Sequence, residues 1–316
     1  MTKRTNTKNS TGPRKRQIKL PPAEPSKVGQ LARALFRPSV LLGLAAVILA
    51  CVALPIIQRS LPDPTQRDEY LTDRNAITVN DPPHWVPRDL VEQVLAQAQI
   101  PETLSLLDDD LTSRIAQAFE HHPWVARVVH VQKSVPAQIN VELEYRRPVA
   151  MVQVDSGMYP IDPQGILLPP SDFSVAETKS YPLIVDVKST PRGSAGTPWG
   201  DPLIFGAARI ADSLSTHWKD FDLQKIRRIP QTSETSTETT FYELVTVGGS
   251  RILWGRAPGA DHPGELTVEQ KIGRLQRYHS DFGGFDEPHG PYEIDIRHWQ
   301  EISRRPLTAG GFRSLR

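Results

Sequence analysis

The sequence predicts an α+β protein with one transmembrane helix, then a small domain of order β-α-α-β-β, then a β-rich domain with two or more helices. Three observations carry this prediction: a long uncharged apolar segment, a run of alternating strand-like and helix-like periods, and a second run in which hairpin patterns flank two amphipathic segments. The segments expected in chain order are a basic tail (1–38), a transmembrane helix (39–57), a linker (58–75), the small domain (76–147), the β-rich domain (148–305) and a C-terminal tail (306–316).

Residues 39–57, SVLLGLAAVILACVALPII, contain no charged side chain. A helix of this length, at a rise of about 1.5 Å per residue, nearly crosses a hydrocarbon core of about 30 Å. A cleaved signal peptide is the alternative interpretation, but such peptides have a far shorter basic region and a small-x-small cleavage site. The segment QRSLPDP, which follows Ile57, has no such site. We therefore expect a single membrane span that is retained.

Charge is divided unevenly along the chain. Residues 1–37 carry ten Lys or Arg side chains and one acidic side chain, whereas the remaining residues carry 27 basic and 35 acidic side chains. Because basic flanks stay on the cytoplasmic side of a membrane, we expect the N-terminus in the cytoplasm and residues 58–316 outside it. A basic tail can also bind nucleic acid. Here it lacks interleaved aromatic residues and adjoins the apolar segment 39–57, so we predict contact with membrane lipid and no nucleic-acid partner.

The only cysteine, Cys51, falls within the predicted span. The part of the chain expected outside the cytoplasm therefore has no disulfide, no catalytic thiol and no cysteine ligand for zinc. Its stability must come from packing.

Five periodic segments predict the small domain. A short strand begins at Ala76, and two amphipathic helices follow over residues 87–100 and 111–122. The carboxylates of residues 108–110 are expected to cap the second helix. The strands VARVVHV and QINVELEY complete the domain, and the strict alternation of the latter is typical of a half-buried strand. That alternation places one set of charged side chains in solvent, namely Glu142 and Glu144.

The β-rich domain is predicted from hairpin patterns and from two segments with apolar residues on one helical face. Its elements in chain order are a hairpin over 149–161, a strand over 181–187, a helix over 203–218, a polar loop over 231–240, a hairpin over 241–255, a helix over 267–278 and a strand from Tyr292. The piece after this last strand is short and no glycine turn precedes it, so only one good strand is predicted there.

Three histidines, His121, His122 and His130, raise the question of a metal site. Adjacent helix residues point about 100° apart, so His121 and His122 do not converge on one ion, and His130 lies on a strand beside positive charge. His122 continues the apolar face of its helix and is predicted to be partly buried. We expect replacement of His121 and His122 together to leave folding nearly intact, whereas Trp124 is expected to seal the helix against the sheet.

No catalytic constellation is visible in the sequence. Residues 108–110 lack the glycine and distal glutamate of a calcium loop, no G-x-S-x-G occurs, and the glycine pairs at 248 and 283 belong to neither a P-loop nor a dinucleotide fingerprint. We therefore predict no enzyme activity, no metal, no cofactor and no small-molecule substrate. Because residues that meet only in the fold can form a catalytic site, a membrane-anchored extracytoplasmic enzyme is a less favoured alternative.

The segment HPWVARVVHVQKSVPAQINVELEYRRPVA, which begins at His122, resembles the POTRA domain of the FtsQ/DivIB cell-division proteins. Members of that family show a helix that ends in Pro-Trp-Val, a basic strand, a turn with proline, an alternating strand and a Glu-Arg-x-Pro-Val-Ala type junction. The motif residues are Pro123, Trp124, Val125, Arg147 and Pro148. The departure from the family is Tyr145-Arg146-Arg147 at the junction. Beyond it the resemblance is weaker and rests on Asp162 and Gly165, Gly255, Lys271 and Leu275, and the segment from Ile294 to Arg297.

This resemblance implies a non-enzymatic, single-pass protein of the bacterial cytoplasmic (inner) membrane that binds and links other division proteins at the septum. The implied partners are small coiled-coil division proteins of the FtsB/FtsL type and septal peptidoglycan synthases. In the family, the last strands form an open sheet edge to which a partner strand adds. The candidates for that edge are Tyr292, Ile294, Ile296 and Trp299, and burial of these residues in the core is the competing interpretation. A POTRA-bearing scaffold in envelope assembly or secretion is the main alternative function.

Overall fold

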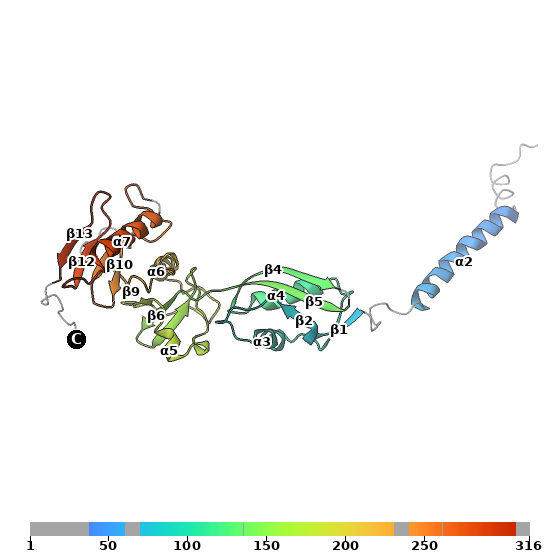
Figure 1. The fold of residues 1–316 in the computed structure, drawn as a ribbon. Coiled ribbons are helices and arrows are strands. Elements are labelled where there is room, and N and C mark those ends of the chain that lie inside the picture. Colours follow the sequence, from blue (N-terminus) through green and yellow to red (C-terminus); the bar gives the residue numbers. More distant parts are fainter. Residues whose placement is uncertain (1–37, 61–69, 135, 231–239, 261, 308–316) are drawn as a thin grey trace, which may run out of the picture. The chain divides into compact units, whose positions relative to one another are not determined.

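The computed structural model describes residues 38–60, 70–134, 136–230, 240–260 and 262–307 (Figure 1). The chain divides into two compact units, residues 1–63 and 64–316, which are described separately. The fold is of the α+β class, as the sequence predicts.

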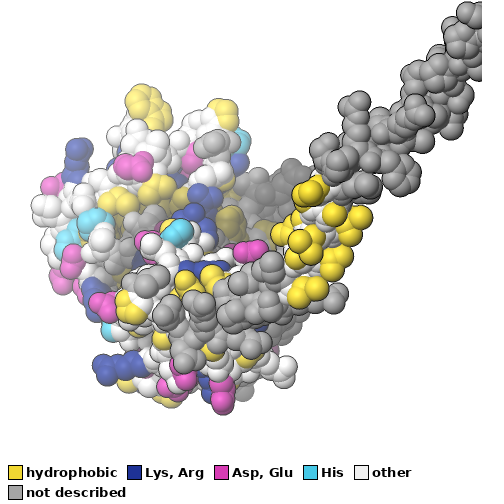
Figure 2. Space-filling model, turned by 90° about the vertical axis from the view of Figure 1, so that its right-hand side faces the viewer, with side chains coloured by type: hydrophobic (Ala, Val, Ile, Leu, Met, Phe, Trp, Pro, Cys, Tyr) yellow, Lys and Arg dark blue, Asp and Glu magenta, His cyan; other side chains and the backbone are white. Residues whose placement is uncertain are grey.

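In the first unit, residues 39–57 lie within one continuous helix, α2 (Pro38–Ser60). Its side chains are described from residue 42 to residue 56, with the exception of residue 44, and most of them are hydrophobic and exposed (Figure 2). Within the described residues, no helix reaches the length and apolar character that a membrane crossing requires. The predicted basic tail (1–38) lies outside the described residues, except for Pro38.

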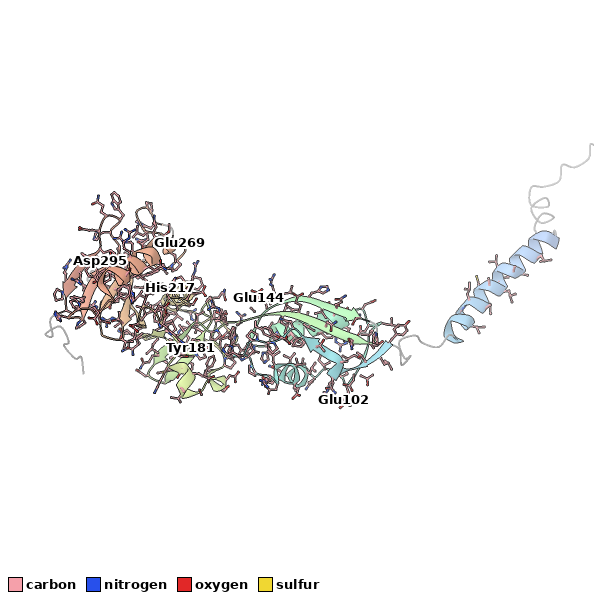
Figure 3. All side chains as sticks on the ribbon, in the orientation of Figure 1. Glu102, Glu144, Tyr181, His217, Glu269 and Asp295 are labelled. Atoms are coloured by element: carbon pink, nitrogen blue, oxygen red, sulfur yellow. The ribbon has the colours of Figure 1, made fainter. Side chains whose placement is uncertain are left out.

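The second unit begins with a three-stranded sheet whose order is β2 (Ile77–Val79), β5 (Gln138–Tyr145) and β4 (Val125–Ser134). Strand β5 pairs in parallel with β2 and antiparallel with β4. Two helices, α3 (Leu90–Gln97) and α4 (Leu111–Glu120), precede β4 in the chain. These five elements follow one another in the predicted order β-α-α-β-β, but a short strand that was not predicted, β3 (Thr103–Ser105), lies between the two helices. Along β5 the burial alternates as predicted, and Glu142 and Glu144 are exposed. Glu144 is labelled in Figure 3.

Two expectations about this region are wrong. The linker over 58–75 contains the end of α2 and a strand, β1 (Leu71–Asp73), which pairs antiparallel with β3 (Thr103–Ser105); a 3-10 turn, η3 (Arg74–Ala76), follows β1. Thr72 is buried there and its hydroxyl donates to the carbonyl of Ala137 (2.6 Å), so this polar segment is fixed by hydrogen bonds. The side chain of Asp110 does not cap α4 either. Instead, the Asp108 carboxylate accepts from the Asp110 amide and pairs with Arg114, both at 3.0 Å.

The rest of the second unit is built on an eight-stranded sheet of order β13-β12-β11-β10-β9-β8-β6-β7. Its strands are β6 (Ala150–Val154), β7 (Gly157–Ile161), β8 (Leu183–Ile184), β9 (Leu223–Arg228), β10 (Tyr242–Thr246), β11 (Arg251–Gly255), β12 (Tyr292–Asp295) and β13 (Ser303–Pro306). Its helices are α5 (Val175–Thr178), α6 (Pro202–Ser213) and α7 (Val268–Phe282), with a 3-10 turn, η4 (Pro170–Asp172).

Both predicted hairpins and both predicted helices are present in this sheet region, although α6 ends at Ser213 rather than near residue 218. The predicted polar loop (231–240) lies outside the described residues, except for residue 240. The larger core joins α6 and α7 to one face of the sheet, where Ile226, Leu244, Ile252 and Ile294 are fully buried. Strand β13 was not predicted. It extends into the segment expected to be a C-terminal tail.

The Pro-Trp-Val motif lies where the three-stranded sheet and the eight-stranded sheet of the second unit meet. Trp124 is fully buried, and its Nε1–H donates to the Asp172 carboxylate at 2.8 Å. Its ring lies 5.9 Å from that of Phe173, and Leu168 belongs to the same core. At Gly196, whose φ is +91°, an added Cβ would lie 3.3 Å from the Cα of Pro123. The core of the predicted small domain is therefore completed by residues beyond its predicted end at residue 147.

The junction motif is fixed by charge. Arg146 pairs with Asp162 at 2.7 Å, and the Asp162 side chain is fully buried and accepts two backbone amides of the predicted turn, from Gln164 and Ile166. The neighbouring Arg147 pairs with Asp212 of α6. These ion pairs connect the end of β5 to the larger sheet region, which explains why two arginines stand in succession before Pro148.

The structure separates the two adjacent histidines. His121 is exposed, whereas His122 is buried and its Nε2 lies 3.3 Å from the Oε1 of Gln93. The Nδ1 of His122 accepts from the Trp124 amide at 3.4 Å, which requires the neutral ring. His122 is thus more deeply buried than predicted, and the expectation that both histidines are dispensable is now restricted to His121.

We expect the fold to lose stability in acid through His122. Burial lowers the pKa of its imidazole below the ordinary value, and the nearby carboxylates of Asp172 and Asp89 oppose that effect only in part. Because the unfolded chain then binds a proton at higher pH than the folded chain, the free energy of unfolding falls as the pH drops below about 6.5. Thermal unfolding of the full chain between about pH 8 and pH 5 measures this loss.

The matched variants are His122→Asn, which keeps an acceptor for the Trp124 amide but does not titrate, and His121→Asn at the exposed neighbour. The first should flatten part of the pH dependence and the second should leave it unchanged. Identical pH profiles for wild type and His122→Asn would contradict this assignment.

Candidate interaction edge of the larger sheet

At one edge of the larger sheet the outermost strand is β13, and among the described residues it pairs only with β12. The pairing is antiparallel and places Arg304 opposite Ile294 and Arg305 opposite Glu293. An edge strand leaves every second residue with an unpaired amide and carbonyl, which another strand can use. Within the described chain, this edge therefore corresponds to the predicted site of strand addition.

The phase of the pairing identifies which backbone groups are open. The amide of Leu307 donates to the carbonyl of Pro291 at 2.8 Å. Because bonded residues alternate along an antiparallel strand, Ser303 and Arg305 turn their backbone groups toward β12, whereas Arg304 and Pro306 turn theirs outward. Pro306 has no N–H, so its outward side offers only an acceptor. The edge is short and Arg304 supplies its outward donor.

Three of the four predicted edge residues are buried. Tyr292 and Ile294 on β12, and Ile296 just beyond it, are at most 7% exposed and belong to the core. Their side chains support the edge from beneath, so the competing interpretation of these residues as core is correct. Trp299 lies between β12 and β13 and is 74% exposed, which leaves it available to a partner.

The chain between the two strands is held by Asp295 and Arg297. The Arg297 guanidinium donates to both Asp295 oxygens at 2.9 and 2.7 Å, and its amide donates to the same carboxylate at 3.0 Å. Burial raises the pKa of the Asp295 carboxyl, but the hydrogen bonds from Arg297 outweigh it and hold that pKa below its usual range. Asp295 marks this turn in Figure 3. The hydrogen bonds within the Ile-Asp-Ile-Arg segment thus fix the start of the connection that leads from β12 to β13.

The face of the sheet opposite α6 and α7 carries a row of alternating charges. Glu243 is fully buried and pairs with Arg227 on β9 and with Arg251 on β11. Arg251 also lies 3.8 Å from Glu293 on β12, which is opposite Arg305 on β13. The two arginines satisfy the buried Glu243 carboxylate on the face of the sheet that points away from the core residues Leu244 and Ile252.

Two cavities lie elsewhere in the second unit. One of about 410 Å³ lies between α3 and α4 and includes Arg114 and His121. Another of about 500 Å³ includes Lys271, whose Nζ lies 2.5 Å from the Glu265 carboxylate. Burial lowers the pKa of Lys271, while Glu265 opposes the shift and keeps the amine engaged in an ion pair. Across the described ranges, no three His, Cys, Asp or Glu side chains cluster as metal ligands do.

Strand β13 could not be predicted from periodicity, because its residues, Ser-Arg-Arg-Pro, show no strand pattern. Charged residues and proline are nonetheless typical of protected edge strands, so this composition was the one feature of the sequence that could have indicated an edge strand here. The geometry of this region is that of a short strand at the edge of a sheet. Comparison with protein-family models and with curated proteins finds no match for the chain.

Proposed function

We propose that this protein is a bitopic membrane protein of the bacterial divisome, of the FtsQ/DivIB type, that binds and links other division proteins during septum formation. The single observation that carries the proposal is the open edge of β13, which suits the addition of a partner strand. The β-α-α-β-β order and the buried position of Trp124 in the Pro-Trp-Val motif agree with a POTRA-type domain over residues 76–147.

In this proposal α2 anchors the protein in the cytoplasmic membrane, with the basic N-terminus inside the cell and residues 58–316 outside the cytoplasm. Exposed apolar side chains along α2, among them Leu42, Leu49 and Ile56, support such an anchor. Small coiled-coil division proteins would add a strand to β13, and the complex would be linked to septal peptidoglycan synthases. Main-chain hydrogen bonds supply affinity in this mode of binding, and neighbouring side chains supply choice.

A fluorescent fusion of the full chain tests the proposal. The fusion should gather at the division site, and depletion of the protein should give filaments without septa. Uniform membrane signal with normal division would contradict the division role and favour a scaffold in envelope assembly or secretion. Diffuse signal through the cytoplasm would contradict the membrane anchor.

A further inference from the structure

A cavity of about 450 Å³ lies where the two parallel strands β6 and β8 begin. Val149 and Pro182, which directly precede these strands, contribute to its wall. Other wall residues are Arg147, which follows β5, and members of the segment that connects α6 to β9. We call it the junction cavity. Its wall contains no residue of β12 or β13, so it is separate from the edge described above.

The buried part of the wall is apolar apart from one hydrogen-bond donor. Pro148, Val149, Pro182 and Ala211 are all buried. Trp218 is only 6% exposed, and within the described ranges no hydrogen bond from its Nε1–H is found. An indole N–H can only donate, and it usually has a partner where the ring is buried. The buried wall therefore presents a donor that lacks an acceptor.

The exposed part of the wall adds positive charge and further donors. Arg147 and Lys219 are both exposed, and of the described residues in the wall only Asp220 is acidic. The Arg147 guanidinium is held in place by its ion pair with Asp212 of α6. Tyr181 is labelled in Figure 3 and also lines the cavity. Burial raises the pKa of its phenol, so this hydroxyl stays protonated at neutral pH and can donate.

We propose that the junction cavity binds a carboxylate group carried on a small apolar body, such as the C-terminal residue of a peptide. A carboxylate only accepts hydrogen bonds, so it can accept from the Trp218 N–H while Arg147 and Lys219 neutralise its charge. The buried apolar wall suits a small apolar group beside that carboxylate. Asp220 disfavours a more highly charged anion such as phosphate. The inference goes beyond the proposed division role and does not depend on strand addition at β13.

Calorimetric titration of the full chain with two pairs of probes tests the inference. The first pair is the peptide N-acetyl-Ala-Ala-Val with a free C-terminal carboxylate and the same peptide with a C-terminal amide. The second pair is isovalerate and isovaleramide, which carry a branched apolar group without a peptide chain. Because hydrogen bonds to a charged acceptor are stronger than those to a neutral one, we expect an acid to bind at least about tenfold more tightly than its amide.

Two variants test the wall. Trp218→Phe removes the indole N–H but keeps an aromatic ring, and Lys219→Gln removes an exposed charge; each should reduce the preference for the acid to less than about threefold. Because Lys219 is exposed, its variant tests the site even if Trp218→Phe weakens the fold. The matched control is Lys179→Gln, which should retain the preference. Lys179 is also exposed and adjoins Ser180 of the wall, but it does not line the cavity itself.

The two pairs of probes distinguish the sources of the carboxylate. A preference for the acid in the peptide pair supports a peptide C-terminus, and a preference in the isovalerate pair alone supports a free acid. Equal binding of acid and amide in both pairs, or no binding of any probe at millimolar concentration, would overturn the inference. A preference that survives both Trp218→Phe and Lys219→Gln, or that Lys179→Gln reduces as strongly as Lys219→Gln, would also overturn it.

Discussion

Replacement of Trp124 by alanine is expected to lower the free energy of unfolding by about 3–5 kcal/mol. The indole is fully buried in the core that packs against the three-stranded sheet. Its loss removes a large apolar volume, and it also removes the N–H that the Asp172 carboxylate accepts at 2.8 Å. The residual cavity and the unpaired carboxylate both act against the folded state.

Chemical denaturation of the full chain measures the effect, and Trp299→Ala provides the matched control. That variant makes the same substitution at a site that is 74% exposed, so it should change the free energy of unfolding by less than about 0.5 kcal/mol. Equal losses from the two variants would show that Trp124 does not anchor the core. Because Trp124 joins α4 to residues beyond Pro148, the unfolding transition of both sheet regions should shift together.

Side-chain periodicity was sufficient to predict most elements that bury one face. The alternation of β5 and the apolar stripe of α7 each give a regular burial pattern, and the structure follows them closely. The two polar strands β1 and β13 were missed because neither buries a regular face. Their positions are fixed by hydrogen bonds to partners distant in the sequence, such as Thr72 to Ala137.

The candidate site was predicted only in part, for a related reason. The alternation of Tyr292 and Ile294 correctly indicated a strand near the end of the chain. Alternating apolar residues, however, identify the face that packs on the core, whereas a partner strand binds backbone groups at the edge. The role of Trp124 was predicted as a core anchor. Its bond to Asp172, 48 residues further along the chain, could not be read from local spacing.

The second large effect is expected at the edge itself. Arg304→Pro removes the outward amide of β13 and leaves the bonds of Ser303 and Arg305 to β12 in place, because proline is tolerated where the N–H faces solvent. Strand addition needs that donor, so this variant should lose partner binding and fail to support septation. Arg304→Gln lacks the same guanidinium but keeps the amide, which isolates the backbone contribution.

Complementation of a depletion strain with these two full-length variants is the most direct test of the account. Both should accumulate to the wild-type level and unfold within a few degrees of the wild type. If the proposed division role holds, cells with Arg304→Pro are expected to be filamentous, and cells with Arg304→Gln to form substantially restored septa. Normal septation by Arg304→Pro would contradict the claim that this protein acts by adding a partner strand to the edge of β13.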